Sequence, residues 1–155
     1  MDISLDELAI KIPIRPTRSW TLNNRDWEEY KVEGRLDGTV VGYIKITRGL
    51  NVCGRYNDRF FLDMSFWTPV PKPYVSYQHT EEDFRGNGIC GKLIMTANEF
   101  YRKKLGTTIY SDTSFVFSFK EQSKQVWRKL QAQRLAAFEP YVTETGESLD
   151  RWHCR

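Results

Sequence analysis

Three glycines stand within six residues of the segment FRGNGICGKLI, residues 84–94, between an arginine and a lysine. The chain before the segment is rich in β-branched and aromatic residues, and the chain after it has apolar residues at helical spacing. A strand that runs through such a loop into a helix directs several unpaired backbone N–H groups toward one place, at the positive end of the helix dipole. A simple turn needs only one or two residues with a permissive backbone. The pattern therefore favours a loop that binds a phosphate or pyrophosphate.

The chain before the glycine loop predicts antiparallel strands. The pair Asp37-Gly38, flanked by β-branched and aromatic residues, predicts a hairpin with strands at 30–36 and 39–47. Looser alternation predicts a third strand at 59–70, before a group of prolines, and a fourth at 74–80. This part of the chain is therefore expected to form a sheet that leads into the loop.

The chain after the loop predicts alternating helices and strands. Apolar residues three and four apart predict an amphipathic helix from Gly91, with Gly106 as its C-terminal glycine. A short buried strand is expected at 107–112, a second helix at 120–133 and a last strand at 134–142, which Pro140 interrupts. The expected fold is α+β (mixed α/β), with a mostly antiparallel sheet and helices on its faces.

Three shorter segments fit more than one local structure. Ser4 and Glu7 have the spacing of a capping box, which predicts a short helix or turn, and the prolines that follow favour extended chain. Residues 113–118 are ambiguous between strand and loop, and either Ser118 or Ser123 could cap the second helix.

The composition fits one domain spanning residues 1–155, with a net charge of only +3 that points to no polyanionic partner. No signal peptide or membrane span is visible, so a soluble, cytoplasmic protein is expected. Cys53, Cys90 and Cys154 are odd in number and widely spaced, which predicts reduced thiols. His79 and His153 have no nearby partners for zinc, so no metal is predicted.

A dinucleotide-binding loop is one alternative. The segment GNGICG matches GxGxxG, and Asp112 follows Gly91 by about the distance at which such folds place an acidic residue. The antiparallel hairpins upstream argue against that fold, and the loop lacks the GK[ST] ending of a nucleotide-triphosphate loop.

The segment RGNGIC, Arg85 to Cys90, resembles the cofactor signature of the GNAT superfamily of acyl-CoA-dependent N-acyltransferases. Phe84 stands in the frequent aromatic place before the signature, and Leu93 follows it on the helix. The order of expected elements resembles the family over roughly residues 30–142. The chain's length and loose catalytic signature are similar to those of phage- or mobile-element-encoded members.

The resemblance implies acetyl-CoA as the co-substrate, with its pyrophosphate on the amides of the loop and its pantetheine arm on the backbone of the fourth strand. It implies direct transfer to an amine, of a small molecule or a protein, in a ternary complex. The cofactor-binding residues that it implies are Gln78, Thr80, Arg85, Gly86, Asn87, Gly88, Ile89, Cys90, Gly91, Lys92, Ser123 and Trp127.

Two residues depart from the family pattern. Cys90 replaces a small glycine or alanine in the signature. Trp127 stands where the family often has a tyrosine that protonates the departing thiolate, and an indole N–H cannot serve as an acid. Trp127 is therefore expected either to pack in the core or to contact the cofactor.

Acyl transfer to an amine needs a base for the amine and a proton for the sulfur. His79 is the first candidate for the base, because imidazole titrates nearest to neutrality, and Glu81 or Glu82 are alternatives. An ordinary structural position in the strand, with no catalytic role, is an equal alternative for His79. For the acid, Tyr110, Ser111 and Ser123 are the candidates, and protonation of the thiolate by water is the alternative.

The sequence therefore predicts an N-acetyltransferase, as a monomer or homodimer. A catalytically inactive GNAT-like protein that binds CoA or a protein partner is the alternative. The helix at 120–133 is basic and contains a tryptophan, but an ordinary solvated face is favoured over nucleic-acid binding.

Overall fold

A computed structural model describes residues 4–22, 25–52, 72–112, 121–142, 146 and 148–155 of the chain. Its element with the longest strands is a hairpin of β3 (Arg25–Leu36) and β4 (Thr39–Val52). Asp37 and Gly38 form the turn with φ of 50° and 80°, the left-handed values that a two-residue hairpin turn needs. The hairpin that the sequence predicts is confirmed, and both of its strands begin or end beyond the expected bounds.

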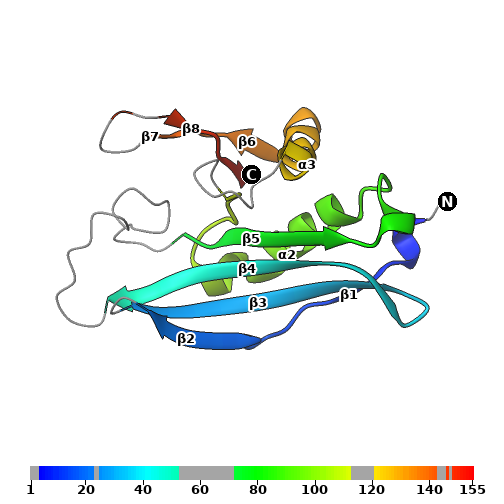
Figure 1. Cartoon of the computed structure of the whole chain (residues 1–155), viewed down its shortest axis with the longest axis horizontal. Helices are drawn as coiled ribbons and strands as arrows, with labels where there is room; N and C mark the ends of the chain where they lie inside the picture. The colour runs from blue at the N-terminus through cyan, green and yellow to red at the C-terminus, as the bar shows by residue number, and fades with distance from the viewer. Residues whose placement is uncertain (1–3, 23–24, 53–71, 113–120, 143–145, 147) are drawn as a thin grey trace.

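The hairpin is the centre of an antiparallel sheet (Figure 1). β5 (Tyr74–Thr80) pairs with β4, while β1 (Ala9–Lys11) and β2 (Arg18–Leu22) both pair with β3. The N-terminal segment thus adds strands where the sequence predicts only extended chain. Before β1, η1 (Leu5–Glu7) is a single turn of 3-10 helix, which confirms the predicted short helix or turn, although the Ser4 side chain makes no cap hydrogen bond.

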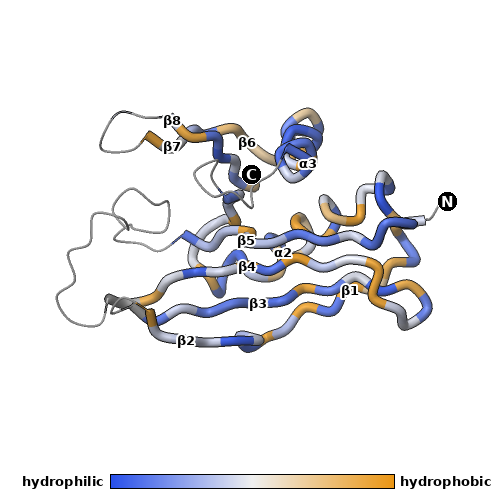
Figure 2. Tube along the Cα trace, in the orientation of Figure 1, coloured by the Kyte–Doolittle hydropathy of each residue, from blue (hydrophilic) through white to orange (hydrophobic). Residues whose placement is uncertain are grey.

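Helix α2 (Ile89–Leu105) covers one face of this sheet, and α3 (Glu121–Ala132) lies beyond β5 (Figure 1). α2 begins two residues before the predicted Gly91 and ends at Gly106, whose φ of 75° is left-handed. Its apolar face packs on the inner residues of β3, β4 and β5 in one cluster of buried side chains. Most of α3 is hydrophilic (Figure 2), so only a narrow stripe of that helix is buried.

A second group of short strands continues the layer past β5. Tyr110 forms a parallel bridge with Tyr74 of β5 and an antiparallel bridge with His153 of β9 (Trp152–Cys154). β9 pairs in turn with β6 (Ala136–Phe138). The strand predicted at 107–112 is therefore a single bridging residue rather than a regular strand.

The strand predicted at 134–142 is divided at Pro140 into β6 and β7 (Tyr141–Val142), and β7 pairs with β8 (Ser148–Leu149). Ser123 lies inside α3 and is not its N-cap. The strand predicted at 59–70, the segment 113–118 and Ser118 lie outside the described residues.

The mixed α+β architecture that the sequence predicts is confirmed, with an antiparallel sheet flanked by two helices. In the part of the chain that the structure describes, no helix has the length and apolar character needed to cross a bilayer.

Candidate functional site

β5 has one paired edge and one largely open edge. On the β4 side it pairs along its length, but on the other side Tyr110 reaches only its first residues, through Val75 N–H to Tyr110 O at 2.8 Å. The register with β4 shifts at Ser76, which is an extra residue and makes a bulge. Within the described ranges no strand pairs with this edge of β5 beyond the bulge. A ligand there could bond to free backbone groups of β5.

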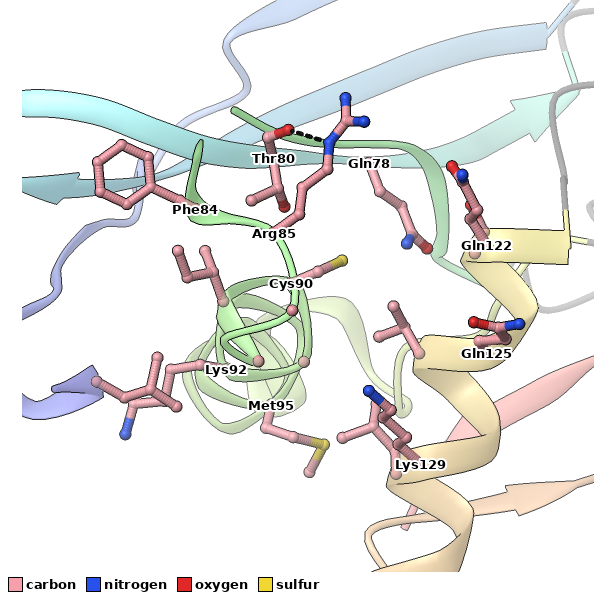
Figure 3. Close-up of a pocket in the computed structure, with 18 of the residues that line it drawn as sticks. Gln78, Thr80, Phe84, Arg85, Cys90, Lys92, Met95, Gln122, Gln125 and Lys129 are labelled. Atoms are coloured by element: carbon pink, nitrogen blue, oxygen red, sulfur yellow. Dashed lines mark hydrogen bonds between the residues drawn. The ribbon is translucent and has the colours of Figure 1, made fainter. Parts of the chain in front are cut away.

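A cleft of about 690 Å³ opens at this edge. Figure 3 shows its walls: the end of β5, the glycine loop and the start of α2 on one side, and α3 on the other. The cleft therefore lies where the loop singled out by the sequence meets an open strand edge.

The glycine loop gives this cleft a bare backbone floor. Gly86 and Gly88 have φ of 82° and 79°, values that residues with a Cβ adopt at a cost, and Gly88 is the N-cap of α2. Gly88 makes no side-chain cap, so the first amides of α2 have no partner within the helix. Asn87 folds back into the loop, where its Nδ2 donates to Phe84 O at 3.0 Å and to Arg85 O at 3.3 Å. The backbone amides at the start of α2 thus offer an anion site at the positive end of the helix dipole.

Gly91 differs from these two glycines. It has an ordinary helical conformation, and a Cβ built on it would lie 3.5 Å from Leu130 Cδ2 of α3, an ordinary van der Waals distance. The packing of α3 on α2 therefore does not require a glycine here.

The charge of the cleft is one-sided. Arg85, Lys92 and Lys129 line it, and the described residues that line it include no Asp or Glu. None of the three cations forms an ion pair with another described residue. Arg85 Nε donates to Thr80 O at 3.0 Å, which orients its guanidinium beside the loop (Figure 3). The cleft therefore suits a ligand with several negative charges.

β5 presents different residues on its two faces. The register places Gln78 opposite the buried Ile44, on the α2 side, and His79 opposite Tyr43, on the other side. His79 borders the cleft, its Nε2 lies 3.1 Å from Glu81 Oε1, and its ring is 5.4 Å from that of Tyr43. Glu81 can thus accept a hydrogen bond from a protonated Nε2, which leaves Nδ1 for another partner.

Tyr110 and Trp127 lie away from the cleft lining. The Tyr110 ring contacts the cations of Lys72 and Arg151 at 4.8 and 5.0 Å, and His153 at 5.4 Å. Burial and the charge of Glu139 raise the pKa of Tyr110, against the effect of Arg151. Tyr110 is therefore a neutral phenol in a charged cluster at the base of β5.

Trp127 is fully buried in the core, and its indole N–H has no hydrogen-bond partner among the described residues. Of the two alternatives that the sequence leaves for Trp127, the structure places it in core packing. Cys90 is buried as well, and burial raises the pKa of its thiol to about 12. A thiol that remains protonated at neutral pH is a poor nucleophile.

Most of the residues predicted for the site meet at the cleft, while Glu81, Asn87, Tyr110 and Trp127 do not line it. The predicted residues that do line it are Gln78, His79, Thr80, Arg85, Gly86, Gly88, Ile89, Cys90, Gly91, Lys92 and Ser123. The sequence patterns do not reveal most of the wall on the α3 side, which consists of Gln122, Gln125, Val126, Lys129 and Leu130, with Gln133 just past the end of the helix. Their spacing of three and four residues marks one helix face, but a polar face is ordinarily exposed to solvent.

In the described ranges, no group of three or more His, Cys, Asp and Glu residues could hold a metal ion.

No protein-family model and no curated protein matches the chain. Among solved structures, the chain is similar to a mutant of the AtaT toxin bound to the C-terminus of the antitoxin AtaR and acetyl-CoA, with 13% identity and a TM-score of 0.50 over 96% of this chain and 94% of that one. It is similar also to AtaTR bound with acetyl-CoA, with 13% identity and a TM-score of 0.50 over 94% of each chain. At this identity the likeness establishes the fold: the chain has a GNAT-like fold.

Proposed function

We propose that this chain is an N-acetyltransferase that moves an acetyl group from acetyl-CoA to an amine within one ternary complex. The observation that carries the proposal is the cleft, whose described lining has three cations, no acidic residue and the bare amides at the start of α2. CoA carries its negative charge on a pyrophosphate and a 3′-phosphate, so its charge matches that of the cleft. The fold adds support, because both similar AtaT structures hold acetyl-CoA.

The cleft suggests how the thioester would be placed. With the pyrophosphate on the loop from Gly86 to Gly88, the pantetheine arm runs along the open edge of β5, between Gln78 and Ser123. Backbone groups of β5 beyond the bulge bond to its amides. The thioester then lies near the bulge, where the acceptor can reach it around the open edge from the face that carries His79.

His79 is the base in this proposal. Glu81 Oε1 accepts a hydrogen bond from Nε2–H and orients the ring, and Nδ1 takes a proton from the acceptor ammonium. The neutral amine attacks the thioester carbon, the tetrahedral intermediate loses its C–S bond, and CoA leaves as the thiolate. The second amine proton passes to solvent.

Ser123 is the only predicted acid that lines the cleft. A serine hydroxyl is a far weaker acid than a thiol, so it donates a hydrogen bond without giving up its proton. The proton on the CoA sulfur therefore comes from water. This route does not need the tyrosine that Trp127 replaces.

Calorimetric titration of acetyl-CoA into the wild type and a Gly88→Glu variant tests the cofactor site. A carboxylate at the N-cap of α2 repels the pyrophosphate, so binding in the micromolar range is expected to disappear. Gly106→Glu is the matched control, because Gly106 has a similar φ of 75° and open space around it, away from the cleft lining. Absence of binding to the folded wild type, or equal binding by all three proteins, would contradict the proposal.

A catalytically inactive CoA-binding protein is the second candidate, favoured by the buried Trp127 at the family's tyrosine position. One AtaT structure also holds the C-terminus of the antitoxin AtaR, so a protein partner would be the natural target of such a chain. The two candidates separate on turnover: an enzyme releases CoA from acetyl-CoA in the presence of amines, detected with a thiol reagent, and a binding protein does not.

A further inference from the structure

Lys129 stands apart from the other two cations of the cleft. Arg85 and Lys92 belong to the glycine loop and the first turn of α2, where the pyrophosphate is proposed to bind. Lys129 comes from α3, and Figure 3 shows it beside Met95, on the side of α2 that faces α3. A single diphosphate on the loop would leave Lys129 without a charge partner.

The other cations within α3 differ from Lys129. Lys124 lies 3.4 Å from Asp150, and Arg128 pairs with Glu121. Lys129 forms no ion pair with any described residue and lines the cleft, which neither Lys124 nor Arg128 does. The charge of Lys129 is therefore available to a ligand.

The surroundings of Lys129 are apolar with one amide. Met95, Leu130 and Leu135 also line the cleft, together with Gln133, which follows the end of α3 and donates its backbone N–H to Lys129 O at 3.0 Å. Apolar side chains can cover the face of a nucleobase, and an amide can bond to its edge or to a ribose hydroxyl. This end of the cleft thus combines the features needed for a phosphorylated nucleoside.

We propose that Lys129 binds the 3′-phosphate of the CoA adenosine and makes the protein prefer CoA to dephospho-CoA, which lacks that phosphate. The inference rests on the proposed function, because it assumes that CoA occupies the cleft. It assigns the nucleotide end of the ligand to Lys129, two turns into α3, away from β5 and its His79.

The test is a comparison of two ligands on three proteins. Dissociation constants for CoA and dephospho-CoA are measured by calorimetry for the wild type, Lys129→Gln and Lys103→Gln. Lys103 is an exposed lysine in the last turn of α2 that does not line the cleft, so its variant controls for net charge. Circular dichroism checks that all three are folded.

The wild type and Lys103→Gln are expected to bind CoA about tenfold more tightly than dephospho-CoA, the size of a partly exposed charge-assisted contact. Lys129→Gln is expected to bind both ligands alike, and the wild-type preference is expected to shrink at high salt. Equal binding of both ligands by the wild type would overturn the inference and leave the proposed function standing. An equal loss of affinity for both ligands in Lys129→Gln would also overturn the inference and leave the proposed function standing. Failure of both ligands to bind the folded wild type would overturn the proposed function as well.

Discussion

Gly42 is the position at which one methyl group should disturb both the fold and the cleft. It lies in β4, opposite Thr80 of β5, on the face that α2 covers. A Cβ built there would lie 3.0 Å from the backbone oxygen of His79 and 3.2 Å from Ile89 Cγ2. Contacts of 3.0 to 3.4 Å are tighter than nine in ten real Cβ contacts, so a neighbour must move by a few tenths of an ångström, and a backbone oxygen of the sheet moves less readily than the end of a side chain.

The magnitude follows from two opposing effects. Overpacking a buried site by a methyl group costs about 1 to 3 kcal/mol. Replacing glycine by alanine restricts the unfolded chain and offsets about 0.4 to 1 kcal/mol of that cost. We therefore expect Gly42→Ala to lower the free energy of unfolding by about 1 to 2 kcal/mol. Because His79 and Ile89 both border the cleft, the variant should also bind CoA more weakly.

Gly34 offers a matched control, because it pairs with Gly42 in the register of β3 and β4. A Cβ at Gly34 would lie 3.2 Å from Leu8 Cδ1 and 3.2 Å from Leu93 Cδ2, which are ends of flexible side chains. Gly34→Ala is therefore expected to stay within about 0.5 kcal/mol of the wild type and to bind CoA normally. Urea unfolding followed by circular dichroism measures both variants. If Gly42→Ala is as stable as Gly34→Ala, the reasoning from close approach is wrong.

Three further predictions concern the site and the core. His79→Ala should lower kcat about 10² to 10⁴-fold and change the pH profile of acetyl transfer. Glu81→Gln should lower kcat less, since the amide oxygen still accepts a hydrogen bond from Nε2. A steady-state assay on an accepted amine measures both variants, and an unchanged pH profile in His79→Ala would exclude His79 as the base. Trp127→Phe should change the free energy of unfolding by only about 1 kcal/mol, because the cost of the lost volume is offset by removal of a buried N–H that has no partner among the described residues. A loss of several kcal/mol in urea unfolding would show that the indole N–H makes a hydrogen bond. Burial raises the pKa of Cys90 to about 12, so the folded state holds a proton that the unfolded state releases above about pH 9. The free energy of unfolding should therefore fall as pH rises from about 9 to 12, and Cys90→Ala should flatten that fall by about one proton; an unchanged slope would contradict the assignment.

Local chemistry makes part of this fold predictable from the sequence. The turn at Asp37 and Gly38 and the end of α2 at Gly106 depend on the φ values that neighbouring residues allow, and the structure confirms both predictions. The strand expected at 107–112 is wrong for a nonlocal reason. Its residues have strand character, but its backbone hydrogen bonds to the start of β5 and to β9 involve only Ile109 to Ser111, and only Tyr110 forms bridges to other strands.

The residues of a possible anion-binding loop can be recognised in the sequence, since bare amides, left-handed glycines and a helix start are all properties of a short segment. The residues opposite that loop depend on how distant segments pack together. α3 is distant in the chain, and its polar face looks like an ordinary solvated surface until the fold places Gln122, Gln125 and Lys129 across the cleft. The fold also decided that Trp127 is buried and that Tyr110 lies away from the cleft lining. Such outcomes depend on contacts between residues far apart in the chain, which the spacing of residues within one segment does not encode.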